Sequence, residues 1–464
     1  MGLLGCSTSA PPLVHFAPKT AQIPLKPNEQ NKESSESESL RSLVQNRCPS
    51  LFTPFQPTWW MNNAHIQTTF SVFADISQVD KIWYRRYDST LSSRLLQAYS
   101  QPFQYRQNLR LVDGGTLGLD FAPIDDSALS DDTPIVVILP GLTGGSYEPN
   151  IKSILIHIIK PVEKGGLGYR CSGGVPITST KFYSAGGTDD FRQALIYISH
   201  RYPRAILLGL AFSLGSNIMT RYIAQEGEKS RLASVCVLAN PWNLAANSDI
   251  LSGTFIGRNV YNKTLGTNLM NIAKLHSNVF MADPSLPIAK ALSPLMSIPQ
   301  MTLSEFDTVF LSQVGGPPPE FPYPNLSATL PVPFLAINSA DDPVVQDVPM
   351  DGSGNGYAVM VLTSGGGHLG WFNDSSGKDR WTTKPVLEWL RLMGEDVMCR
   401  TGMKEGEEDL GCKECEGGGL INGNAGVEGI RNRIIKWRRI RTYECIGVAV
   451  TAPLMDWFVE LIEE

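Results

Sequence analysis

The sequence predicts an α/β protein with a mostly parallel central sheet and helices on both faces. Short apolar runs recur along the chain, as is typical of strands buried on both faces. Segments with helical spacing separate several of them, the order that parallel strands require because they need crossover connections. Small-residue or Gly-rich turns follow the runs at 134–139, 205–210 and 357–362. These turns would therefore gather at one edge of the sheet.

Bulk composition narrows the class of protein further. The chain has 464 residues, 42% of them hydrophobic and 18% charged, which suits one large globular domain with appendages or two domains. The net charge is −6, and no basic field would attract nucleic acid. The 8 cysteines are scattered, which indicates a reducing compartment. Without a membrane-length apolar run or a secretory signal, we expect an intracellular, cytoplasmic protein.

Changes in composition divide the chain into three parts. Residues 1–47 are polar, with a Ser/Glu repeat at 33–39, and are expected to form a disordered tail. Residues 48–400 are expected to form the α/β domain, with a helical cap inserted at about 243–325. The cap offers candidates for an apolar acyl pocket, although packing within the cap itself is the alternative for each: Leu269, Met270, Phe280 and Met281.

Residues 401–464 are predicted to be a Gly/Glu-rich linker followed by an extension of unknown role. A basic stretch at 431–441 and an apolar stretch at 445–462 leave open a peripheral contact with a membrane or a lipid droplet. Cys412 and Cys415 form one CxxC pair without a second pair, so zinc is not expected. The sequence implies no metal and no organic cofactor.

Ser213 is the candidate nucleophile. It stands where the apolar run 205–210 breaks at a small-residue turn and passes into a segment of helical spacing. This strand–turn–helix context is that of a nucleophile elbow, which holds a serine on a tight turn with its hydroxyl exposed. Small residues are needed two positions before and after the serine, and Ala211 and Gly215 meet this need. An ordinary strand-to-helix turn remains the alternative until partner residues are found.

A Gly-rich loop at 140–146 follows the buried run at 134–139. It would present backbone N–H groups at the same sheet edge, and we expect the N–H groups of Leu142 and Leu214 to form an oxyanion hole. A phosphate-binding loop is disfavoured because the Lys-Ser/Thr pair and the GxGxxG spacing are absent. An ordinary loop stays open as the other alternative.

Two further strand ends supply an acid and a base. The order Ser213, Asp342, His368 is the chain order of the α/β-hydrolase triad. Of the six histidines only His368 follows the acid, and it lies on a Gly-rich loop. We choose Asp342 over Asp341, which would then cap the turn. His65 is expected to have a structural role.

The chain resembles the AB hydrolase 4 family of the AB hydrolase superfamily, which includes YheT-like hydrolases and fungal medium-chain fatty-acid ethyl ester synthase/esterases. The resemblance spans roughly residues 50–395 and rests on PTWWMNNAHIQT (57–68), VDGGTLGLD (112–120), LPGLTGGSYEPNI (139–151), RCSGGVPITSTKFYSAGGTDDFRQAL (170–195), FSLGSNIMTRYIAQEG (212–227), ANPWNL (239–244), NSADDPV (338–344) and GGGHLGW (365–371). It implies an α/β-hydrolase fold and an ester-handling enzyme. The family's triad falls on Ser213, Asp342 and His368.

Three features depart from the family. Ala211 replaces the usual glycine of the elbow, and residues 401–464 have no recognised counterpart. Residues 160–169 lack the apolar strand that the family has before Arg170, so a core strand is expected to be missing. This would leave a gap in the sheet or force a neighbour to fill it, and a segment spliced out of the gene model would leave the same pattern.

The sequence therefore predicts a serine carboxylic ester hydrolase that acts on small-molecule acyl esters, either medium-chain or lipid-like, through an acyl-enzyme. An acyltransferase that makes esters from an acyl donor and an alcohol is one alternative. A catalytically impaired hydrolase fold used for binding is another. The oligomeric state is left open.

Overall fold

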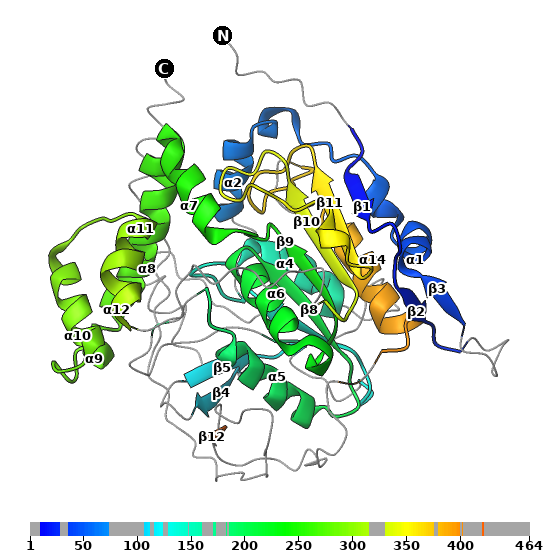
Figure 1. The fold of residues 1–464 in the computed structure, drawn as a ribbon, viewed down its shortest axis with the longest axis horizontal. Helices are drawn as coiled ribbons and strands as arrows, with labels where there is room; N and C mark the ends of the chain where they lie inside the picture. The colour runs from blue at the N-terminus through cyan, green and yellow to red at the C-terminus, as the bar shows by residue number, and fades with distance from the viewer. Residues whose placement is uncertain are drawn as a thin grey trace.

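A computed structural model describes residues 10–27, 36–73, 106–111, 116–123, 129–146, 148–159, 170–172, 182, 185–314, 330–374, 379–399, 401 and 420–421. A seven-stranded sheet forms its centre, with the order β1-β11-β10-β9-β8-β6-β7 (Figure 1). Neighbours from β11 to β7 pair in parallel, and β1 pairs antiparallel with β11 at one edge. The strands are β1 (Leu13–Phe16), β6 (Ile135–Leu139), β7 (Arg170–Ser172), β8 (Leu207–Phe212), β9 (Leu232–Leu238), β10 (Phe334–Ser339) and β11 (Ala358–Thr363). The predicted α/β fold with a mostly parallel sheet is confirmed.

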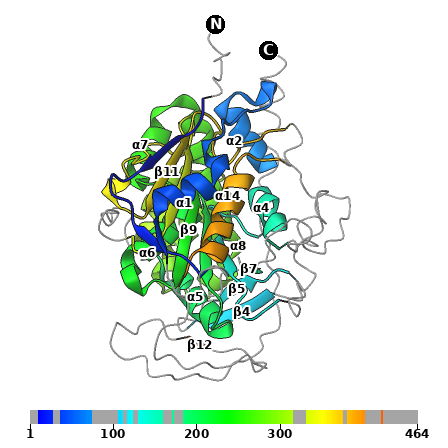
Figure 2. The same cartoon turned by 90° about the vertical axis from the view of Figure 1, so that its right-hand side faces the viewer.

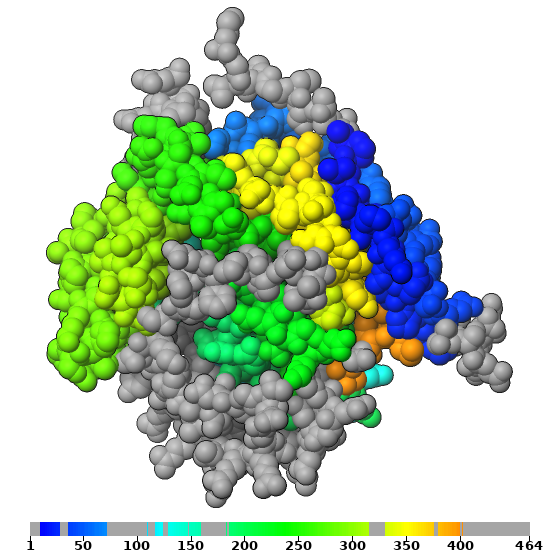
Figure 3. Space-filling model, viewed as in Figure 1, coloured from blue at the N-terminus to red at the C-terminus, as the bar shows by residue number. Residues whose placement is uncertain are grey.

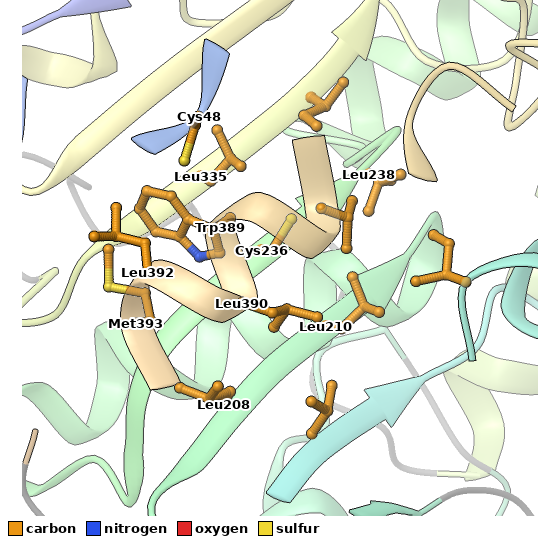
Figure 4. Close-up of a cluster of buried hydrophobic side chains, with 14 of the residues drawn as sticks. Cys48, Leu208, Leu210, Cys236, Leu238, Leu335, Trp389, Leu390, Leu392 and Met393 are labelled. Atoms are coloured by element: carbon orange, nitrogen blue, oxygen red, sulfur yellow. The ribbon is translucent and has the colours of Figure 1, made fainter. Parts of the chain in front are cut away.

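Helices cover both faces of the sheet because alternate residues of each buried strand point to opposite sides. One face packs against α1 (Leu40–Arg47), α4 (Pro149–Ile159) and α14 (Thr383–Arg391), and Figure 2 shows α1 beside α14. Figure 4 shows this core, in which Leu208 and Leu210 of β8 and Cys236 of β9 lie near Trp389 of α14. The other face packs against α5 (Asp189–Arg201) and α6 (Leu214–Glu226).

Shorter elements complete the domain. They are η1 (Pro49–Phe52), η2 (Trp59–Met61), α2 (Ala64–Phe73), η4 (Gly227–Lys229), η8 (Gly352–Gly354) and η9 (Leu392–Asp396). Helix α5 has Thr188 as its N-cap and two acidic residues, Asp189 and Asp190, in its first turn. No described helix has the length and apolar character needed to cross a membrane.

The N-terminal segment forms part of the fold, so the predicted disorder is wrong for residues 10–27 and 36–47. β1 extends the central sheet, with Leu13 opposite Leu362 and Phe16 opposite Val359. β2 (Gln22–Pro24) pairs with β3 (Ser37–Ser39). α1 then buries Leu40, Leu43 and Val44, an apolar stripe at helical spacing. Residues 1–9 and 28–35 lie outside the described part.

The expected missing strand is present in shortened form. β7 begins at Arg170, and its three residues pair in parallel with β6 at the edge of the sheet. Its residues lie opposite Ile135, Val136 and Val137, the first three residues of β6. The predicted hairpin at 105–121 is confirmed as β4 (Arg106–Leu111) and β5 (Thr116–Asp120), which join β12 (Leu420–Ile421) in a separate three-stranded sheet. Residues 160–169 lie outside the described part, as do 402–419 and 422–464.

The chain between β9 and β10 is helical across most of its described residues, 244–314. These helices form the lobe at the left of the view in Figure 3. They pack around a core of their own that includes Leu269, Met270 and Phe280, whereas Met281 is exposed. Three of the four candidates for the acyl pocket therefore pack within the cap itself, as the alternative interpretation predicted. The elements are α7 (Leu244–Gly253), η5 (Gly257–Asn262), α8 (Lys263–Leu275), α9 (Ser277–Phe280), α10 (Pro287–Leu292), η6 (Ser293–Ser297), α11 (Leu303–Phe306), η7 (Asp307–Leu311) and α12 (Ser312–Val314).

Candidate active site

Ser213 lies on a strained turn between β8 and α6. Its φ is 49°, a left-handed conformation that side chains other than glycine seldom adopt. Such strain persists where the surroundings over-determine the backbone, and it is common at functional sites. The N–H of Ser213 donates to the carbonyl of Leu238 at 2.9 Å, which ties the turn to β9. A Cβ added at Gly215 would lie 2.3 Å from the carbonyl oxygen of Pro140, so the helix approaches the Gly-rich loop too closely for a side chain.

The structure brings together the three side chains predicted from separate strand ends. Ser213 Oγ lies 2.8 Å from His368 Nε2, and His368 Nδ1 lies 2.8 Å from Asp342 Oδ2. Asp342 is 1% exposed, and its Oδ1 accepts hydrogen bonds from the N–H groups of Val344 at 2.8 Å and Val345 at 2.9 Å. These two donors hold the carboxylate so that Oδ2 faces the imidazole.

Asp341 has a different position from its neighbour. Its Oδ1 accepts a hydrogen bond from the N–H of Gly367 at 2.9 Å and another from the hydroxyl of Ser339. Burial raises the pKa of Asp341 above its ordinary value, and these hydrogen bonds partly oppose the shift. Asp341 thus ties the loop that carries His368, whereas Asp342 caps the turn after β10. The predicted capping role of Asp341 is wrong in this respect.

Helix α2 anchors the other side of the His368 loop, a role that sequence reasoning missed. Thr68 Oγ1 accepts a hydrogen bond from the N–H of His368 at 2.9 Å, and Ser71 Oγ donates to the carbonyl of His368 at 3.2 Å. Gln67 Oε1 accepts from the N–H of Phe372 at 3.1 Å. The sequence feature that could have indicated this role is the motif at 57–68, which includes Gln67 and Thr68.

His65 points toward the helical insertion. Its Nδ1 lies 2.8 Å from the hydroxyl of Tyr261 in η5, and the two rings are stacked with centres 5.7 Å apart. Burial lowers the pKa of His65, which favours the neutral imidazole. The structure gives His65 a contact between α2 and the insertion, which accords with the structural role expected of it.

The two expected oxyanion donors lie beside Ser213. Leu214 is the first residue of α6, where a backbone N–H has no partner within its own helix. The Gly-rich loop lies against the serine, since a Cβ added at Gly141 would be 3.3 Å from Ser213 Cβ. Leu142 follows directly, and its side chain packs against the core of the helical insertion.

A serine on a strained strand-to-helix turn, a histidine and a buried carboxylate, joined by hydrogen bonds at the carboxyl ends of a mostly parallel sheet, are the arrangement of an α/β-hydrolase fold. Within the described residues, no group of three or more His, Cys, Asp or Glu side chains could hold a metal ion.

Comparison with known proteins shows the family. The chain is 30% identical over 302 residues to an abhydrolase domain-containing protein of Dictyostelium discoideum, covering 61% of this chain and 73% of that protein. It belongs to the abhydrolase-domain family, in agreement with its resemblance to AB hydrolase 4, and is an enzyme of the serine hydrolase type.

Other relatives have lipase names. The chain is 26% identical over 428 residues to the monoacylglycerol lipase of Saccharomyces cerevisiae, covering 86% of this chain and 94% of that protein. It is 27% identical over 370 residues to the phospholipase ABHD3 of Homo sapiens, covering 74% of this chain and 81% of that protein. No model of a protein family matches. An esterase of Pyrococcus furiosus aligns with a TM-score of 0.38 and 12% identity, over 66% of this chain and 96% of its own.

Proposed function

We propose that the protein is a serine esterase that hydrolyses acyl esters through an acyl-enzyme on Ser213. The observation that carries this proposal is the hydrogen-bonded chain from Ser213 Oγ through the His368 ring to Asp342. A serine hydroxyl is a weak nucleophile until a base takes its proton. His368 is the base, and Asp342 orients its ring and stabilises the imidazolium that forms.

The proposed reaction has two halves. Ser213 Oγ attacks the ester carbonyl while its proton passes to His368 Nε2, and the N–H groups of Leu142 and Leu214 stabilise the oxyanion. His368 then gives the proton to the leaving alcohol as the carbon–oxygen bond breaks. In the second half a water molecule attacks the acyl-enzyme, loses its proton to His368, and releases the acid and Ser213.

The substrate class that we propose is a medium-chain or lipid-like acyl ester. Two supporting observations come from different sources. Leu142, next to the proposed oxyanion site, packs against the apolar core of the helical insertion, so apolar surface lies close to where an acyl chain would bind. The relatives have names that refer to monoacylglycerol, phospholipid and medium-chain ethyl ester substrates. We propose accordingly that residues 243–325 cap the site.

Acyl transfer to an alcohol is the second candidate function. It uses the same acyl-enzyme, with an alcohol in place of water in the second half. The supporting observation is the likeness to medium-chain fatty acid ethyl ester synthase/esterase 2 of Saccharomyces cerevisiae, 29% identical over 290 residues and covering 58% of this chain and 64% of that protein.

We also propose that the enzyme meets its substrate at a lipid surface. Trp59 is 84% exposed and Phe255 is 75% exposed, and large apolar side chains of this kind favour the lipid interface. Trp59 precedes α2 and Phe255 precedes η5, the two elements joined by the His65–Tyr261 contact. Co-sedimentation with phosphatidylcholine vesicles should fall in a Trp59→Ser, Phe255→Ser variant but not in Leu13→Ser, which changes an exposed leucine of β1. Equal binding by all three proteins would overturn this proposal.

The experiment that tests the proposed function is acid release from p-nitrophenyl esters of graded chain length, with and without ethanol. The Ser213→Ala variant is the control. Hydrolysis that is greatest at medium chain length and disappears in the variant is the expected result. Ethyl ester formation faster than acid release would reassign the protein as an acyltransferase. Folded wild-type protein as inert as the variant would contradict both and leave the binding-protein alternative.

A further inference from the structure

Arg380 is a buried cation outside the proposed triad. Its side chain is 2% exposed. Burial lowers the pKa of its guanidinium to about 9, so the group keeps its charge at neutral pH. Burying a charge without compensation is costly, so the groups around Arg380 must replace its lost hydration.

The contacts of Arg380 are concentrated on the segment that follows His368. Nη1 donates a hydrogen bond to the carbonyl of Gly370 at 3.0 Å and another to the carbonyl of Leu369. The guanidinium carbon lies 4.2 Å from the centre of the Phe372 ring, a cation–π contact. Arg380 thus holds three of the four residues after His368.

The backbone of the segment after His368 is strained. Leu369 has a φ of 61° and Trp371 a φ of 52°, strained conformations that persist only when neighbouring groups impose them. The carbonyl of His368 accepts from Ser71, and the next two carbonyls accept from Arg380. Three successive peptide groups are therefore oriented by side chains from two distant parts of the chain.

Glu148 is a buried carboxyl beside the Gly-rich loop whose charge attracts that of Arg380. Its N–H donates to the carbonyl of Gly145 at 3.0 Å, so it directly follows the loop that carries Leu142. Burial raises the pKa of its carboxyl to about 7, while attraction from Lys152 and Arg380 opposes the shift. Nε and Nη2 of Arg380 form no hydrogen bond within the described residues. The Phe372 ring and the attraction of Glu148 oppose the cost of burying the guanidinium.

We propose that Arg380 is a positioning residue for His368. It fixes the peptide groups that follow the histidine through its hydrogen bonds to the carbonyls of Leu369 and Gly370. The catalytic part of this proposal rests on the proposed function, because His368 is the base there. The structural part, the orientation of the His368 ring, can be measured without a substrate.

The test compares Arg380→Met and Arg380→Lys with Arg231→Met. Arg231 is a matched control because it is also buried and donates to Ser199 Oγ, but it directly precedes β9 and therefore lies at the amino ends of the parallel strands, away from His368. We expect Arg380→Met to lower kcat for a p-nitrophenyl ester about 10²-fold, the effect of a displacement near 1 Å. KM should change less than about threefold. Arg380→Lys keeps the charge without the planar fork and should lose less. Rates are expressed per active site titrated with a fluorophosphonate, so that unfolded protein does not count.

A second readout is the low-field proton resonance of His368 Nδ1–H, observed in protein labelled with ¹⁵N-histidine. This proton lies in the contact with Asp342, so its signal reports the orientation of the ring. We expect the signal to be lost or shifted in Arg380→Met and kept in Arg231→Met; if Arg380→Met does not fold, Arg380→Lys gives the same comparison. An unchanged signal with unchanged kcat would overturn the proposal. Wild-type protein that shows the resonance but hydrolyses no ester would instead contradict the proposed function, and the resonance would still decide the role of Arg380.

Discussion

Replacing Gly215 with alanine tests whether the close contact between α6 and the Gly-rich loop is needed for catalysis. The added methyl carbon would lie 2.3 Å from the carbonyl oxygen of Pro140 and 2.7 Å from that of Leu139. Carbon–oxygen contacts are usually about 3.3 Å or longer, so the helix and the loop must move apart by about 1 Å. Overpacking of this kind costs about 1–3 kcal/mol of stability. Because Gly141 and Leu142 follow Pro140, the same movement would shift the proposed oxyanion site and lower kcat about 10²-fold.

Gly253→Ala is the matched control for this prediction. Gly253 ends α7, and nothing lies within 4 Å of a Cβ added there. Alanine at this position should change stability by at most about 1 kcal/mol and leave kcat unchanged. Calorimetric Tm and kcat for a p-nitrophenyl ester would be measured for both variants. If Gly215→Ala had the Tm and kcat of the wild type, the close contact between α6 and the Gly-rich loop would not be needed for stability or catalysis.

Three further substitutions have definite expected outcomes. Asp342→Asn should lower kcat about 10⁴-fold by disturbing the orientation and tautomer of His368. Asp341→Asn should lower kcat less than tenfold. If a steady-state assay showed the larger loss of kcat in Asp341→Asn, the acid would be misassigned. Ala211→Gly should reduce the free energy of unfolding by about 0.5–1 kcal/mol, because glycine weakens a strand, while kcat stays within twofold; a large gain in kcat would mean that the alanine impairs the elbow. Burial raises the pKa of Asp307 to about 6 in the folded protein. The unfolded chain therefore loses this proton at lower pH, and the folded state loses stability as pH rises from about 4 to 6. The shift of about two pKa units corresponds to about 3 kcal/mol, reduced to about 1–2 kcal/mol by partial exposure. Asp307→Asn should therefore raise stability at pH 8 and have little effect at pH 4, whereas exposed Asp249→Asn should do neither; a pH-independent effect in urea titrations would argue against this cause.

The geometry around Ser213, Asp342 and His368 followed from the sequence because buried parallel strands have a strong local signal. Each strand is a run of apolar residues, and the chemistry lies directly after its last residue. The order of the three residue types along the chain then selected Asp342 and His368 from many carboxylates and imidazoles. Local patterns sufficed because every step concerned one strand and the turn after it.

The parts that sequence reasoning missed depend on contacts between distant segments. Averaging composition over residues 1–47 concealed the short stripe of Leu40, Leu43 and Val44 that seats α1 on the sheet. Similarly, no local pattern indicates that Thr68 accepts a hydrogen bond from His368. The hydrogen bonds from Arg380 to the carbonyls of Leu369 and Gly370 also become visible only in the folded structure.

The most direct test of the central claim is intact-protein mass spectrometry after reaction with a fluorophosphonate, followed by peptide mapping. We expect one adduct per chain, located on Ser213, with loss of esterase activity in proportion to labelling. Ser213→Ala should take up no adduct and have no activity. An unlabelled wild-type protein, or ester hydrolysis that persists in Ser213→Ala, would contradict the assignment of Ser213 as the nucleophile.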